Sequence, residues 1–272
     1  MNEVFKKYFK EIVAGLIFLF MYLPVFVWMW DRWWARDSYY SHGILIPFVS
    51  AYLIWQMKDE LKKIPRQESV WGIRLILIGI ALHLLSALFR IYFSSGFSML
   101  IVLAGMVLHF FGREVFKKIA FPIAFLFFMI PLPMVVIANI SFKLKLFAAK
   151  VATFILNSMG ITAIQQGSII HMRSAHVIVD DVCSGVRSLV SLAALGSIAA
   201  YWMKSSMGKR LILFISTVPI AIITNVCRVI ILSCVSEIWG AEHATGFLHD
   251  ATGFMVFALA CVLLYFVKRL IE

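Results

Sequence analysis

From Leu211 to Ile238 the chain reads LILFISTVPIAIITNVCRVIILSCVSEI. This run is longer than the roughly 20 apolar residues that a helix needs to cross a bilayer. Only Arg228 and Glu237 interrupt it with charge. The whole chain has the same character, because 62% of its residues are hydrophobic and only 14% are charged, whereas soluble domains carry about 25% charged residues. We therefore expect a polytopic membrane protein.

Shorter apolar runs elsewhere predict an all-α protein with about eight transmembrane helices in a single integral-membrane domain, residues 1–272. The spans are expected near Ile12–Trp30, Ile44–Met57, Trp71–Leu88, Phe97–Phe111, Ile119–Met134, Val182–Trp202, Leu211–Ile238 and His249–Val267. The net charge of +11 comes largely from Lys and Arg clustered between the runs. This pattern is typical of cytoplasmic loops facing anionic lipid, and it argues against a nucleic-acid partner. The protein should lie in the inner membrane with both termini in the cytoplasm.

One long segment, residues 131–181, is expected on the extracytoplasmic side. Phe142 to Met159 has apolar residues at helical spacing with lysines between them, which is typical of a helix in the membrane interface. Ile161 to Val179 combines a turn signal, Gln165 to Gly167, with alternating β-branched residues. This pattern predicts a short hairpin or extended pair.

Cys183 lies where the sixth span begins, in the sequence DDVCSGVR from Asp180 to Arg187. The amides and dipole of a helix N-terminus favour the thiolate form of such a cysteine, and Arg187 adds positive charge on the same helix face. The amides of Ser184 and Gly185 could also bind a developing oxyanion. A buried structural cysteine beside a helix cap explains the same residues equally well.

Two further polar side chains are expected at the depth of Cys183. Arg228 lies roughly 26 Å along a core of roughly 30 Å, with Asn225 on the same face. A cation there is a functional candidate by default, although it could instead snorkel to the headgroups. His249 opens the last span beside Asp250 and could act as a general acid or base. An ordinary interfacial histidine is the alternative.

A metal site is the weaker interpretation of these residues. His42, at the extracytoplasmic start of the second span, could join His243, His249, Asp250 and Cys183 in a ligand set. Their spacing matches no recognised metal motif, and no cysteine pair shows the CxxC spacing of a zinc ribbon or redox dithiol. We therefore expect neither a metal nor another cofactor.

At these positions the sequence resembles the exosortase/archaeosortase family of integral-membrane processing enzymes. The matching stretches are Tyr40–Gly43 with Pro47, Phe121–Pro122 with Pro131–Pro133, Val182–Ser188, Asn225–Arg228 and His249–Gly253. The ordered set covers nearly the whole chain. Histidine at position 249 is similar to the exosortase side of the family.

The resemblance implies a membrane-embedded cysteine protease or transpeptidase that works through a thioester intermediate. Its substrates would be secreted proteins ending in a short motif (Pro-Glu-Pro in the bacterial case), a transmembrane helix and a basic tail. Cys183 would be the nucleophile, with Arg228 and His249 as its catalytic partners. Supporting or substrate-binding roles are expected for Ser184, Gly185, Arg187, Asn225, His42 and Asp250.

Two other classes of function stay open from the residues alone. In a transporter or channel, Arg228 and Asn225 would line the substrate path. The clustering of polar residues at one membrane face, instead of at the midplane, disfavours this class. In a lipid- or polysaccharide-modifying enzyme, Arg228 would bind a phosphate group.

Overall fold

The computed structural model describes residues 8–35, 38–180, 185–240 and 247–272, except the side chains of Phe247, His249 and Asp250. Apart from one small sheet, the regular structure in these ranges is helical. The chain divides into two compact units, Met1–Leu132 and Pro133–Glu272. This division does not test the single domain expected from the sequence, which stays a prediction.

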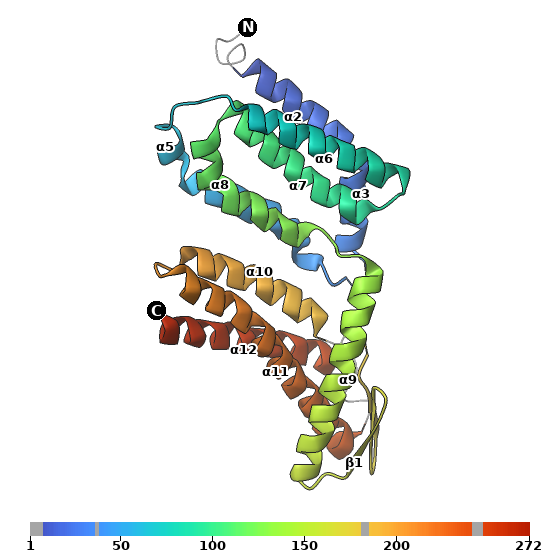
Figure 1. Ribbon diagram of the computed structural model, residues 1–272. Helices are drawn as coiled ribbons and strands as arrows, with labels where there is room; N and C mark the ends of the chain where they lie inside the picture. Colours follow the sequence, from blue (N-terminus) through green and yellow to red (C-terminus); the bar gives the residue numbers. More distant parts are fainter. Residues whose placement is uncertain (1–7, 36–37, 181–184, 241–246) are drawn as a thin grey trace. The chain divides into compact units, whose positions relative to one another are not determined.

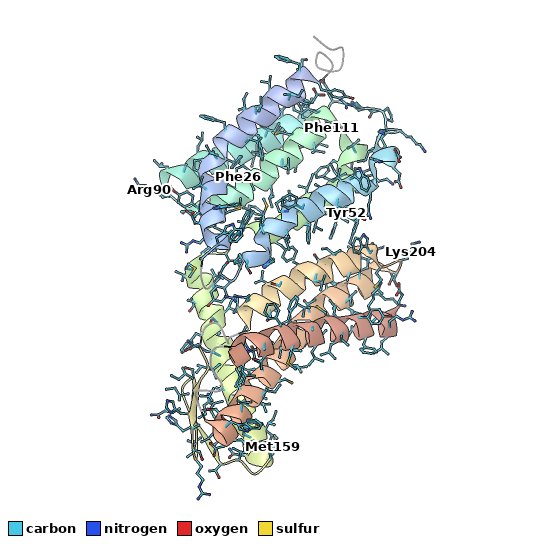
Figure 2. The ribbon with its side chains drawn as sticks, turned by 180° about the vertical axis from the view of Figure 1, so that it is seen from behind. Phe26, Tyr52, Arg90, Phe111, Met159 and Lys204 are labelled. Atoms are coloured by element: carbon cyan, nitrogen blue, oxygen red, sulfur yellow. The ribbon has the colours of Figure 1, made fainter. Side chains whose placement is uncertain are left out.

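The described residues of the first unit form helices. They are α2 (Phe9–Met21), α3 (Leu23–Trp33), α4 (Leu45–Gln56), α5 (Lys58–Leu61), α6 (Val70–Leu88), α7 (Tyr92–Phe110) and α8 (Arg113–Phe125), with the 3-10 helices η1 (Ser41–Ile44) and η2 (Leu126–Met129). Helices α6 and α7 lie side by side (Figure 1). Figure 2 shows Arg90, in the turn between them, and Phe111 at opposite ends of α7.

The first predicted span is not one straight helix. Helices α2 and α3 meet at an angle of 57°. Pro24 lies in the first turn of α3, where the missing N–H costs nothing but the helix before it cannot continue unbroken. Tyr22, at the break, is fully buried, and its hydroxyl lies 2.9 Å from the Oγ of Ser98 in α7. The break therefore has a specific packing partner within the unit.

Glycines allow α6 and α7 to approach closely. A Cβ on Gly105 would lie 2.8 Å from the backbone nitrogen of Ile76 and 2.9 Å from the backbone oxygen of Gly72. On the facing helix, a Cβ on Gly79 would lie 2.5 Å from Cγ2 of Val102. Small residues at the interface are the usual means by which transmembrane helices bring their backbones together.

Replacing Gly105 with alanine should separate this helix pair, because a methyl group cannot push a backbone aside without moving the helix. We expect a loss of about 2 kcal/mol, typical of an overpacked interior, and a melting temperature about 5 °C lower in detergent. Gly15→Ala is the matched control, since no described atom outside its own helix lies within 4 Å of its added Cβ. Equal melting temperatures for the two variants would contradict the packing described here.

In its described residues, the second unit combines four helices with a three-stranded antiparallel sheet. Its elements are α9 (Met134–Ser158), β1 (Ala163–Gln166), β2 (Ile169–Met172), β3 (His176–Ile178), α10 (Val186–Trp202), α11 (Met207–Trp239) and α12 (Phe247–Ile271). The strand order is β1-β2-β3. The sheet packs on α9 through Ile170, which is fully buried with Ala152 and Leu156. A second core, which includes Leu192 and Leu213, joins α10, α11 and α12.

The helices confirm an all-α membrane protein, whereas the count of eight spans is not confirmed. By length and composition four helices in the described ranges could cross a bilayer, namely α6, α7, α11 and residues Ala251–Ile271 of α12. The number rises to six if each of two bent pairs counts as one span. The predicted span Ile44–Met57 contains only the 12 residues of α4, too few to cross a core of roughly 30 Å.

Residues 131–181 also differ from their expected form. Helix α9 begins at Met134, well before the interfacial helix expected from Phe142 onward, and the segment that follows it holds three strands. Large apolar side chains are exposed along the helices, with Phe20 at 81% and Phe254 at 80%. Such exposure is expected where lipid and not water covers the surface.

Candidate active site

Helix α10 begins against helix α11. Its N-cap residue, Gly185, adopts left-handed φ and ψ angles of 83° and 0°, which glycine accepts without strain. A Cβ at this position would also lie 2.8 Å from Cγ of Asn225 in α11. Asn225, only 5% exposed, therefore packs directly on the backbone that starts α10. The preceding residues Cys183 and Ser184 lie outside the described residues.

Arg228 lies on α11 one turn beyond Asn225 and is 9% exposed. Its guanidinium faces Gly253 of α12, since a Cβ on that glycine would be 3.5 Å from Nη2 and 3.7 Å from Cζ. The guanidinium therefore lies at about van der Waals distance from α12 at Gly253. The contact brings the first turns of α12 to the polar part of α11.

His249 and Asp250 lie in the first turn of α12. His249 precedes Gly253 by four residues, which places both on one face of the helix with a rise of about 6 Å between them. Their side chains lie outside what the structure describes. The backbone therefore brings His249 to the face of α12 that contacts Arg228.

Further polar side chains are buried around Arg228 without having been predicted. Thr224 is fully buried and donates a hydrogen bond to the backbone oxygen of Ile220 at 2.9 Å. Thr252, 6% exposed, precedes Gly253 on α12. The spacing of Thr217, Thr224 and Arg228 could have revealed this stripe, because residues seven and four apart share a helix face.

Arg187 occupies the second position of α10. Its Nε is buried and makes no hydrogen bond to any described atom. Guanidinium nitrogens are hydrogen-bond donors only.

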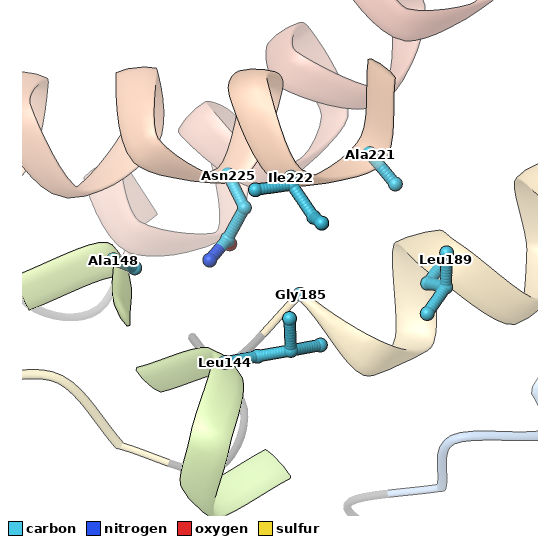
Figure 3. Close-up of a pocket in the computed structure, with 7 residues that line it drawn as sticks. All are labelled: Leu144, Ala148, Gly185, Leu189, Ala221, Ile222 and Asn225. Atoms are coloured by element: carbon cyan, nitrogen blue, oxygen red, sulfur yellow. The ribbon is translucent and has the colours of Figure 1, made fainter. Parts of the chain in front are cut away.

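A small pocket lies between α9, α10 and α11 (Figure 3). It is partly open, and its cavity volume is about 10 Å³, room for about one water molecule. Its lining consists of Leu144, Ala148, Gly185, Leu189, Ala221, Ile222 and Asn225. Figure 3 shows the side chain of Asn225 directed into this space, where it is the one polar side chain among the lining residues.

His42 lies in the first unit, whereas the other candidates lie in the second. Its ring stacks on Tyr40 with the centroids 5.8 Å apart. Burial lowers the pKa of His42 to about 4, so its ring is neutral at pH 7. The next residue, Gly43, packs on Trp33, whose Nε1 donates to the backbone oxygen of Met129 at 2.9 Å. The stretch Tyr40–Gly43 thus forms a packed corner within the first unit.

The transmembrane exosortase family matches residues 33–266, which is most of the chain. The chain belongs to this family. The match contains the corner at Tyr40–Gly43, the start of α10, the polar part of α11 and the first turns of α12. No curated protein and no solved structure matches this exosortase. The resemblance noted from the sequence is thereby confirmed at the level of the family.

Proposed function

We propose that this exosortase is a membrane cysteine transpeptidase or protease that removes the C-terminal sorting signal of secreted proteins. The observation that supports this best is the contact between Arg228 and α12. A guanidinium buried in a transmembrane helix is costly unless it meets a partner or a charge that develops during a reaction. It lies against the helix face that also carries His249.

Cys183 is the nucleophile in this proposal. It precedes Gly185 by two residues, and two residues of chain span at most about 7 Å. Gly185 packs on Asn225, which is itself one turn from Arg228. A thiol that precedes α10 therefore belongs to the same part of the unit as the guanidinium. The positive end of the α10 dipole favours its thiolate form.

The reaction proceeds in two balanced steps. His249 takes the proton of the Cys183 thiol, and the thiolate attacks the carbonyl carbon of the scissile peptide. The oxyanion that forms is stabilised by Arg228 and by the amides of Ser184 and Gly185. The C–N bond then breaks, the leaving amine takes the proton from His249, and a thioester remains. An amine, a hydroxyl or water then gives a proton to His249 and attacks the thioester, and this proton passes to the departing sulfur, which restores the thiol of Cys183.

The substrate would be a secreted protein with a short motif, a transmembrane helix and a basic tail, whose helix enters laterally from the bilayer. Arg187, at the start of α10, would donate hydrogen bonds to the motif. The site would face the periplasm, with both termini in the cytoplasm. Supporting this orientation, the segment between Glu237 and Asp250 contains neither Lys nor Arg.

The test uses a secreted reporter that ends in such a tripartite tail and carries one tag before the tail and another after it. Cells that contain this exosortase should separate the two tags, whereas cells that lack it should keep them on one chain. Immunoblots against both tags give the processed fraction. Equal retention of both tags with and without the exosortase, for tails with several different motifs, would contradict the proposed function.

A further inference from the structure

Two histidines lie opposite each other on neighbouring strands of the small sheet, and the proposed reaction uses neither. His171 in β2 is paired with His176 in β3. The centroids of their rings are 6.3 Å apart. The sequence alone does not predict this pair, because the position of the turn between β2 and β3 decides which residues of the two strands lie opposite each other.

The hydrogen bonds of the sheet place this pair where side chains come closest. Met172 donates to the backbone oxygen of Ala175, and Val179 donates to that of Ser168, both at 2.9 Å. In an antiparallel ladder, hydrogen-bonded and non-hydrogen-bonded pairs alternate. His171 and His176 therefore form a non-hydrogen-bonded pair, in which the Cα atoms are about 4.5 Å apart.

Both histidines lie on the open face of the sheet. They are exposed, whereas Ile170, the neighbour of His171 in β2, is fully buried against α9. On the other side of β2, Ile164 of β1 is paired with His171 and is 67% exposed. The three positions form one row across the sheet that solvent can reach.

We propose that His171 and His176 bind a divalent transition cation such as Zn²⁺, Ni²⁺ or Cu²⁺. Neutral imidazole nitrogens are preferred ligands of these ions, at about 2.0–2.1 Å. Because both side chains are exposed, their rings can turn toward one ion without disturbing the core. No group of three or more metal-ligating side chains occurs among the described residues, and in this proposal water fills the remaining coordination positions.

The charges at the neighbouring turn come from two side chains. Arg173 follows β2 and would repel a cation. The carboxylate of Glu237, from the end of α11, accepts hydrogen bonds from the backbone nitrogen of Ser174 at 3.0 and 3.2 Å. It places a negative charge at the same turn, which offsets that of Arg173.

A bound ion would fasten β2 to β3 across the turn. Strand β3 ends at Ile178, five residues before Cys183 in the chain. The cation would thus stabilise the segment that leads to the proposed nucleophile. The site itself does not depend on the proposed reaction.

The experiment titrates the purified full-length protein in detergent with Ni²⁺ or Zn²⁺ by calorimetry, using an affinity tag that contains no histidine. One ion should bind per chain. Loss of one ligand, in His171→Ala or His176→Ala, should weaken binding about tenfold or more, since even indirect supports of a metal site contribute that much. Binding unchanged in both variants would overturn the proposal.

Two further variants distinguish binding by the His171–His176 pair from nonspecific binding of the ion to surface histidines. The double variant His176→Ala with Ile178→His keeps the number of histidines and the exposed face but breaks the direct pairing with His171. It should bind as weakly as His176→Ala alone. Ile164→His adds a third imidazole to the row and should tighten binding about tenfold or more. Wild-type affinity in both of these variants would also overturn the proposal.

Discussion

Cys183→Ser is expected to reduce processing of a tailed reporter to background, a loss of about a thousandfold or more. A serine hydroxyl at this position has a far higher pKa than a thiol, so the helix dipole and Arg187 cannot supply an anionic nucleophile. The measurement is the rate at which the two tags of the reporter separate in membranes that contain equal amounts of either protein.

Cys261→Ser is the matched control. Cys261 is a partly buried free cysteine within α12 and lies among apolar residues. Its replacement should leave the processing rate close to that of the wild type. Unimpaired processing by Cys183→Ser, or an equal loss in both variants, would remove Cys183 from the role of nucleophile.

Arg228→Lys is expected to lower the processing rate about a hundredfold, the usual effect of removing one donor to an oxyanion. The variant keeps a positive charge, but lysine lacks the planar fork of donors and carries its charge as a single point. The guanidinium also lies against Gly253 of α12. The loss should appear in kcat more than in KM, because the oxyanion exists only after attack has begun.

Arg210→Lys serves as the control on the same helix, because Arg210 lies near the opposite end of α11. It should process the reporter at the wild-type rate. The contrary result would be a wild-type kcat in Arg228→Lys with a raised KM. That outcome would assign Arg228 to substrate binding and not to the reacting centre.

Hydropathy predicted the class of the protein but not the shape of its helices. The run from Leu211 to Ile238 lies within α11, which extends it by four residues at its start and one at its end. The break at Tyr22 was not predicted, because one proline inside a long apolar run does not say whether the helix bends or ends there. The hydroxyl of Tyr22 contacts Ser98, a residue far away in the chain.

From the sequence we predicted which residues form the candidate site and at which depth in the membrane they lie. The contacts between their side chains could be described only with the structure. Counting residues along a span placed Arg228 near the level of Cys183 and His249, yet helix rotation decides which neighbours a side chain meets. The packing of Gly185 on Asn225 and of Arg228 on Gly253 depends on such rotations. The roles of Cys183 and His249 stay predictions, as does the facing of the site toward the periplasm.

The thioester on Cys183 is the central claim, and mass spectrometry of the enzyme tests it most directly. The exosortase would be mixed with the tailed reporter, quenched in acid during turnover and digested. We expect the peptide that contains Cys183 to carry the reporter fragment that ends at the cleaved bond, that is, the part before the released tail. Neutral hydroxylamine should remove this linkage. Turnover of the reporter with unmodified Cys183, or with the fragment on another residue, would contradict this mechanism.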